Sequence, residues 1–225
     1  MKPSFSHQGN RALTLTEVLV VIFVIAFAVA LLLLALAAAK RKHARINCIS
    51  NLKQIGIAFR LWEGDNNDKY PMAVSVTNGG AMELVATGNV AACFRVMFNE
   101  LSRPKILHCP ADTDHVAATN FATGLSGANI SYFVSPDAVE TYPQMILDGD
   151  DNLLVDGKPV QPGILNLRPG TTIGWTKDRH HGVGNIGMAD GSAQQVTSEG
   201  FQRANSIALN SVLAPGSATN RWLIP

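Results

Sequence analysis

The chain has 225 residues and a formal net charge of +1 at neutral pH, a balance that argues against a nucleic-acid-binding protein. Residues 1–63 carry eight Lys/Arg and two acids, whereas residues 64–225 carry ten Lys/Arg and fifteen acids. A basic stalk and an acidic head could therefore attract each other between copies, or both could simply be solvated. The part beyond Trp62 is long enough to bury a core of its own.

The N-terminal segment contains an apolar run long enough to cross a bilayer. Val18–Ala39 has neither charge nor proline, and as a helix it would be about 33 Å long. A secretory signal peptide has a shorter apolar core and a small-residue cleavage site after it, which this segment lacks. A simple signal anchor fits the length but leaves the acidic Glu17, at the start of the run, unexplained.

The stretch "RALTLTEVLVVIFVIA" resembles the cleavage signal of type IV prepilins and type II secretion pseudopilins. The resemblance implies that prepilin peptidase cuts between Ala12 and Leu13 and methylates the new amino terminus. Glu17 is then the fifth residue of the mature chain, as in the family. Ala12 replaces the usual Gly and Leu13 the usual Phe, changes that would lower the efficiency of cleavage.

The resemblance also implies a role for Glu17 in assembly. In the family this carboxylate is thought to pair with the α-amino group of a neighbouring subunit, and a buried carboxylate is tolerable only when it is paired. The alternative is that Glu17 acts only as an acid at a helix N-terminus, where the macrodipole favours negative charge.

The charges beside the apolar run and the family resemblance imply opposite orientations in the membrane. Two Lys/Arg precede the apolar run, and four follow it directly, which by the positive-inside rule favours a cytoplasmic head. The family resemblance implies the opposite topology, a single pass through the inner membrane with an extracytoplasmic head. We follow the resemblance.

Beyond Lys40 the helix is expected to continue as an amphipathic stalk to about Glu63. Apolar residues recur every three or four positions at Ile46, Ile49, Leu52, Ile55, Phe59 and Trp62. "GDNNDKYP" (residues 64–71) supplies stop signals. Gly56 either lets the sheet approach closely or is a mildly costly surface glycine. We expect four parts: a leader (1–12), a transmembrane and assembly helix (13–39), an amphipathic stalk helix (40–63) and a globular head (64–225).

Two further stretches resemble a bacterial group of pseudopilin-like proteins. "CISNLKQIGIAFRLWEGDNNDKYP" is similar to their stalk-to-head junction, and "HHGVGNIGMADGSAQQV" is similar to their His-X9-Asp-Gly element, here His180, Asp190 and Gly191. Asp190-Gly191 suits a two-residue type I′ hairpin turn. The simpler interpretation of this element is a surface turn. The alternative is a metal-binding or catalytic role for His180, His181 and Asp190.

The middle of the head reads as loops, short strands and one helix. "GNVAACFRVMFNELS" (residues 88–102) has helical periodicity with Asn89 as the candidate cap. "KILHCPAD" (105–112) and "NISYFVS" (129–135) favour strands. "PQMILDGDDNLLVDGKPV" (143–160) suggests two strands joined at 149–152 and a turn at Asp156-Gly157.

An oxygen-rich cluster falls in this last stretch and would suit calcium. It comprises Asp148, Asp150, Asp151, Asn152 and Asp156. The cluster departs from the EF-hand pattern, because Leu153 stands at the Gly position and Pro159 at the bidentate Glu position. Asp, Asn and Gly are also ordinary turn formers, so calcium binding and plain turns both remain open.

The three cysteines are Cys48, Cys93 and Cys109, and their spacing matches no zinc signature. An odd number forbids full pairing within the chain; an extracytoplasmic head would allow a Cys93–Cys109 bridge. Motifs of an assembly ATPase, a zinc protease or a serine hydrolase are absent from the sequence.

Together these observations predict an α+β, pilin-like protein: a long N-terminal helix packed on an antiparallel sheet. We expect a structural subunit of a type II secretion pseudopilus or type IV pilus-like filament, not an enzyme. Its expected partners are prepilin peptidase, other pseudopilin subunits and the inner-membrane assembly platform, with no required cofactor. The alternatives are a membrane-anchored binding module and a metal-dependent enzyme built on His180, His181, Asp190 and the Asp148–Asp156 cluster.

Overall fold

A computed structural model describes residues 14–168, 170–212 and 220–225. The chain divides into two compact units, residues 1–42 and residues 43–225. The helix α1 (Leu15–Gly64) contributes to both. It ends within a residue of the predicted stop, where Asn67 and Asp68 adopt positive φ and turn the chain away.

In the first unit, α1 is apolar on all sides. Its side chains from Leu15 to Lys40 are exposed, including large residues such as Phe23 and Leu34. The helix is long and apolar enough to cross a membrane by length and composition, as predicted.

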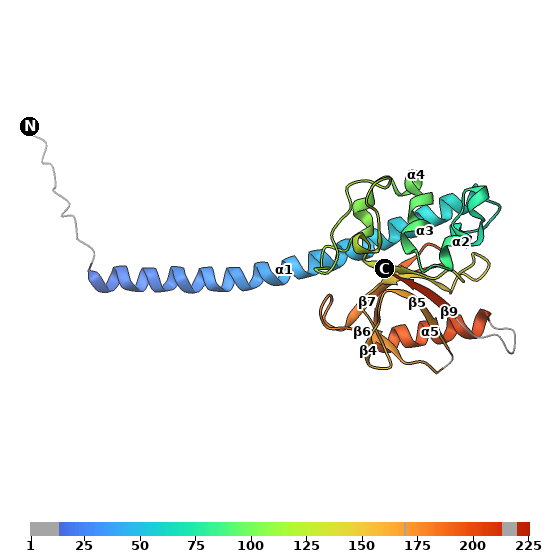
Figure 1. Ribbon diagram of the computed structural model, residues 1–225. Coiled ribbons are helices and arrows are strands. Elements are labelled where there is room, and N and C mark those ends of the chain that lie inside the picture. The colour runs from blue at the N-terminus through green and yellow to red at the C-terminus, as the bar shows by residue number, and fades with distance from the viewer. Residues whose placement is uncertain (1–13, 169, 213–219) are drawn as a thin grey trace, which may run out of the picture. The chain divides into compact units, whose positions relative to one another are not determined.

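The second unit is an α+β head of three layers, in which the helices α2–α4 and the second half of α1 cover one face of a sheet (Figure 1). The described helices of this layer are α2 (Met82–Val85), α3 (Val90–Val96) and α4 (Phe98–Leu101), with 3₁₀ turns η1 (Pro71–Ala73), η2 (Val76–Asn78), η3 (Pro104–Leu107) and η4 (Gly127–Asn129). Helix α5 (Ser198–Val212) lies on the other side of the sheet (Figure 1).

The described strands form two antiparallel sheets. The larger has six strands in the order β5-β9-β1-β2-β7-β8, and the smaller has three in the order β4-β3-β6. Their bounds are β1 Tyr132–Val134, β2 Ile146–Asp150, β3 Leu153–Val155, β4 Lys158–Pro159, β5 Gly163–Leu167, β6 Ile173–Trp175, β7 Val183–Met188, β8 Ala193–Thr197 and β9 Asn220–Ile224. The predicted antiparallel character is confirmed. The predicted strands at 143–160 are also confirmed, but β2 and β3 belong to different sheets.

One core lies between α1 and the large sheet. The buried stripe of α1 is Cys48, Leu52, Ile55, Phe59 and Trp62. Ile46, which we expected in this stripe, is 53% exposed. Three residues of an α-helix turn through about 300°, which is about 60° short of a full turn. Three such steps separate Ile46 from Ile55, so the two side chains lie on opposite faces of the helix.

A second core fills the space between the large sheet, the small sheet and α5. Phe133 of β1 stacks on Trp222 of β9 with ring centroids 4.3 Å apart, and Phe201 of α5 stacks on Trp175 of β6 at 4.2 Å. Two α5 side chains also bind the backbone of β6, because Gln202 Oε1 accepts from Ile173 N–H and Ser198 Oγ accepts from Trp175 N–H. The tryptophans Trp62, Trp175 and Trp222 are all buried and serve as packing residues.

Local predictions in the helical layer had mixed outcomes. Asn89 caps α3 by accepting a hydrogen bond from Ala92 N–H, as predicted. The strand expected at residues 105–112 is wrong. Pro104 begins the 3₁₀ turn η3 there, since its fixed φ suits the first position of a helical turn.

Candidate functional site

The N-terminal processing site, Ala12 and Leu13, lies outside the described residues. Glu17 lies in the first turn of α1 and is exposed. Its carboxylate accepts hydrogen bonds from Thr14 N–H at 2.8 Å and Thr14 Oγ–H at 2.7 Å, and both bonds end on Oε2. Thr14 Oγ1 in turn accepts from Glu17 N–H at 3.3 Å. This reciprocal pair is a capping box, which stabilises the start of the helix.

The His-X9-Asp-Gly element contacts α1 at both of its ends. The backbone carbonyl of His180 accepts a hydrogen bond from Arg45 at 3.2 Å. At the other end, Gly191 lies against Gly56, where a Cβ on Gly56 would be 3.1 Å from the Gly191 carbonyl oxygen. The two contact points are eleven residues apart on the helix, about 16 Å, a distance that strand β7 spans. The element therefore joins the sheet to the helix, and the close approach expected at Gly56 is confirmed.

The turn at the end of this element is a hairpin, as predicted, but not of type I′. Gly191 N–H binds the carbonyl of Met188, and Met188 N–H binds the carbonyl of Ser192. Gly191 has φ +81° whereas Asp190 has negative φ. This pattern is a type I turn followed by a glycine bulge, a three-residue loop. Asp190 stabilises it by accepting from Ser192 N–H.

The two adjacent histidines have different environments. His180 is buried at 2% exposure, and His181, which precedes β7 in a turn with φ +59°, is exposed. Within the described ranges, the groups of three metal-ligating side chains that converge include neither His181 nor Asp190. The arrangement thus does not bring His180, His181 and Asp190 together as a metal centre.

The five residues considered for calcium are distributed over separate places. Asp148 and Asp150 are buried within β2. Asp151 forms an ion pair with Arg179, and the amide of Asn152 donates to Thr176. Asp156 lies in the β3–β4 turn, where its carboxylate accepts from Thr172 N–H. The predicted turn at Asp156-Gly157 is confirmed by the positive φ of both residues.

A buried ionic cluster lies beside this region and was not predicted. Arg179, with only 4% of its side chain exposed, binds Asp112 at 2.8 Å, the carboxylate of Asp151 and the carbonyl of Ser131. His115 Nδ1 contacts Asp112 Oδ2 at 2.8 Å.

Within this cluster, Asp112 and His115 favour each other's ionised state, whereas burial raises the pKa of Asp151. The hydrogen bond from His115 and the charge of Arg179 outweigh burial and lower the pKa of the Asp112 carboxyl. The bond to Asp112 raises the pKa of His115. Buried charges are stable only with such partners.

The cluster forms one wall of a cavity of about 260 Å³. The other wall is largely apolar and includes Leu153, Val160 and Ile224. With Asp114 and Asp178 at its lining, the cavity has more carboxylates than cations, so its chemistry favours a small ligand with a positive charge or several hydrogen-bond donors.

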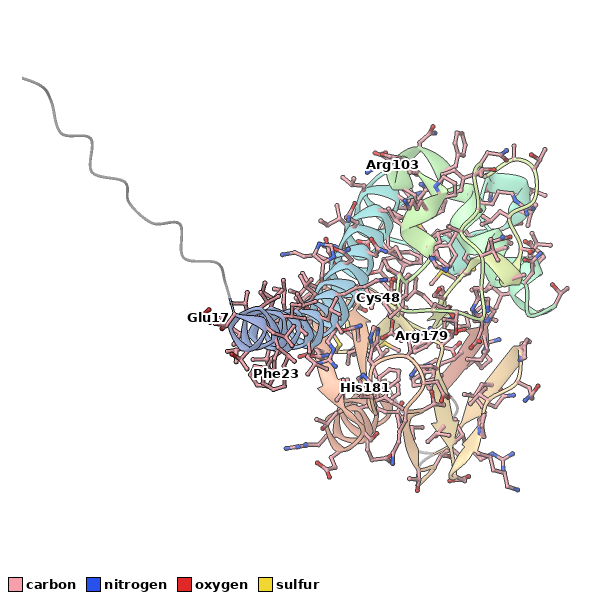
Figure 2. All side chains as sticks on the ribbon, turned by 90° about the vertical axis from the view of Figure 1, so that its left-hand side faces the viewer. Glu17, Phe23, Cys48, Arg103, Arg179 and His181 are labelled. Carbon is pink, nitrogen blue, oxygen red and sulfur yellow. A yellow bond between two sulfur atoms is a disulfide. The ribbon has the colours of Figure 1, made fainter. Side chains whose placement is uncertain are left out.

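Cys48 of α1 forms a disulfide with Cys109, which follows η3 (Figure 2). The Cys93–Cys109 bridge considered from the sequence is therefore wrong. Within the described residues, Cys93 is a free thiol. It is buried in α3, and burial raises its pKa to about 12. The two bridged residues have Cα atoms 5.0 Å apart despite a sequence separation of 61, a proximity that the packing of α1 on the head creates.

Two buried titratable groups flank this disulfide. His180 Nε2 lies 3.5 Å from Cys109 Sγ and 3.5 Å from Asp150 Oδ2. Burial, together with the charges of Arg179 and Arg45, lowers the pKa of His180 to about 4. Burial raises the pKa of Asp150 to about 7. The neighbouring Asp148 is buried as well, and burial raises its pKa well above the usual range.

Comparison of the chain with protein-family models, curated proteins and solved structures finds no match to any of the three.

Proposed function

We propose that this protein is a pilin-like structural subunit, which prepilin peptidase cuts between Ala12 and Leu13 and which then assembles into a pseudopilus or pilus-like filament. The observation that carries the proposal is the position of Glu17. A carboxylate stands five residues after the expected cut and directly before an uncharged helix of membrane-spanning length. A plain anchor has no need of a charge there.

The architecture of the head supports a structural role. The second half of α1 supplies a full stripe of the head's core, from Cys48 to Trp62, so the stalk and the head are built as one body over residues 43–225. The disulfide of Cys48 and the contact of Gly56 with Gly191 add two further ties. Such a body suits a subunit that must transmit force from its helix to its head.

The disulfide also supports an extracytoplasmic head. Disulfides persist in oxidising compartments and are rare in the cytoplasm. The disulfide therefore favours the orientation that the family resemblance implies over the one that counting Lys and Arg favours. The proposed location is the inner membrane, with the head in the periplasm, and the proposed partners are prepilin peptidase, other pseudopilin subunits and the assembly platform.

The role of Glu17 in assembly can be separated from its role in helix capping. Glu17→Gln keeps a hydrogen-bond acceptor for Thr14 but removes the charge, whereas Thr14→Ala disrupts the capping box and keeps the charge. If the charge pairs with a neighbouring amino terminus, Glu17→Gln abolishes crosslinked oligomers in the membrane, and Thr14→Ala retains them. All variants should insert into the membrane. Oligomers that persist in Glu17→Gln and disappear in Thr14→Ala would assign Glu17 to capping alone.

A second candidate function is a membrane-anchored binding module, which the cavity beside Arg179 favours. In that case small cationic ligands would raise the melting temperature of the detergent-solubilised protein, and Asp151→Asn would remove the effect. The amino terminus would remain Met1.

A further inference from the structure

Three metal-ligating side chains from different segments converge where α1 packs on the head, and a fourth lies next to one of them. The three are Cys48 of α1, Cys109 after η3 and His180 before β7, and the fourth is Asp150 at the end of β2, beside His180. The two sulfur atoms and a nitrogen of His180 lie within 4.8 Å of one another. His180 Nε2 is 3.5 Å from Cys109 Sγ and from Asp150 Oδ2. All four residues are at most 2% exposed.

The donor types, and the two separations measured from His180 Nε2, match what zinc requires. Zinc takes four ligands in a tetrahedron, from Cys sulfur, His nitrogen and carboxylate oxygen, at about 2.0–2.3 Å. Neighbouring ligand atoms of such a tetrahedron are then about 3.3–3.8 Å apart. The two 3.5 Å separations around His180 Nε2 fall in this range. In addition, Asp150 Oδ1 is buried and has no hydrogen-bond partner among the described residues.

We propose that the dithiol form of this protein binds one zinc ion through Cys48, Cys109, His180 and Asp150, as an alternative to the disulfide. Opening the disulfide takes two electrons and two protons from a dithiol reductant, which is itself oxidised to a disulfide. Zinc then replaces the two thiol protons and releases them to solvent. In either state Cys48 links α1 to the head, through the disulfide or through the zinc ion. The link therefore exists before the cysteines are oxidised. This proposal does not rest on filament assembly.

The second convergent group, Asp112, His115 and Asp151, is a poorer metal site. Arg179 already places its guanidinium on both carboxylates, at 2.8 Å from Asp112 and in direct contact with Asp151. A metal would have to displace this buried cation. At the Cys48–Cys109 site, by contrast, the sulfur atoms become ligands as soon as the disulfide opens.

The test uses the full chain in detergent, reduced with a phosphine under anaerobic conditions and titrated with Co²⁺ and then Zn²⁺. The reduced wild type should bind one equivalent of cobalt with thiolate charge-transfer and tetrahedral d–d absorption, and zinc should displace it. The oxidised protein should show neither band. His180→Ala and Asp150→Asn should each weaken cobalt binding by more than about 10-fold. Cys93→Ser, which removes the remaining thiol, should leave it unchanged.

A second measurement covers the case in which a substitution disturbs folding. In the wild type, zinc should slow the re-formation of the Cys48–Cys109 disulfide by an added oxidant at least about 10-fold, and a chelator should restore the rate. The absence of cobalt absorption in the reduced wild type, loss of the bands in Cys93→Ser, or a re-oxidation rate that zinc does not change would each overturn the proposal.

Discussion

Gly56 of α1 lies against Gly191 of the β7–β8 turn, so closely that a Cβ at Gly56 would be 3.1 Å from a carbonyl oxygen and 3.2 Å from a Cα. The neighbouring atoms are backbone atoms, which cannot rotate away as a side chain could. Together with the bond between Arg45 and His180, this contact fixes both ends of the His-X9-Asp-Gly element on the helix. The element thus has a structural explanation that needs no catalytic role.

A large side chain at Gly56 should separate the helix from the sheet. Gly56→Leu is expected to lower the free energy of unfolding by about 1–3 kcal/mol, because overpacking forces backbone shifts. Lys53→Leu, on the exposed side of the same helix, is the matched control. Urea unfolding followed by tryptophan fluorescence measures both. A Gly56→Leu variant as stable as Lys53→Leu would show that the contact is loose.

Arg179 should be one of the most sensitive positions in the head. Arg179→Met would leave the buried carboxylates of Asp112 and Asp151 without their cation and should cost about 3–5 kcal/mol of stability. The stability of Arg179→Lys should lie between that of the wild type and that of Arg179→Met, because an ammonium group cannot replace all the contacts of a guanidinium that also binds Ser131. Arg203→Met, at an exposed position of α5, serves as the control. An Arg179→Met variant within about 1 kcal/mol of the wild type would contradict the assigned role.

The buried Asp148 should make the head less stable as the pH rises. Its pKa is raised by burial and by the nearby Asp150, and its oxygens have no hydrogen-bond partner of good geometry in the described part of the chain. The folded chain therefore holds a proton that the unfolded chain releases near pH 4. The stability due to this proton is complete below that pH and falls by up to about 1.4 kcal/mol per pH unit above it, until the folded pKa is reached.

Asp148→Asn removes this dependence with little change of shape. Between pH 5 and pH 8 the free energy of unfolding of the variant should depend less steeply on pH, because about one proton fewer is released on unfolding. At the alkaline end of this range the variant should be more stable than the wild type. Thermal unfolding across this range measures the slope, with Asp65→Asn, an exposed position, as the control. A profile identical to that of the wild type would show that Asp148 is ionised in the folded state.

The disulfide should be the main covalent constraint on the head. A peptide map without reduction should link Cys48 to Cys109 and leave Cys93 free. Reduction in the presence of a chelator should lower the free energy of unfolding by about 2–4 kcal/mol, since the bridge closes a loop of 61 positions. The map would contradict the structure if it linked Cys93 to either of the other cysteines.

Features with a local signal could be predicted from the sequence. The end of α1 near Gly64, the cap at Asn89 and the hairpin at Asp190-Gly191 each depend on residues a few positions apart. The close approach at Gly56 could be anticipated because a glycine within an apolar stripe often marks a packing contact. Helix α5, in contrast, was not predicted, although Thr197 caps it by accepting a hydrogen bond from Gly200 N–H. Its position is fixed by the bonds of Ser198 and Gln202 to β6.

The ionic cluster and the disulfide could not be predicted in the same way. Asp112 and Arg179 are 67 positions apart, and the link between them depends on how the helical layer packs on the sheet. The sequence shows only scattered polar residues there. Cys109 can pair with Cys48 only because Cys48 lies on the buried face of α1. The apolar stripe indicates this position for Cys48 only once Ile46 is excluded from the stripe.

The amino-terminal mass of the protein purified from its native membrane tests the central claim most directly. The chain should begin at an N-methylated Leu13, with the twelve-residue leader removed. An intact Met1, in cells whose peptidase processes other prepilins, would contradict it. The head would then have to be explained as the working part of a simple membrane-anchored protein.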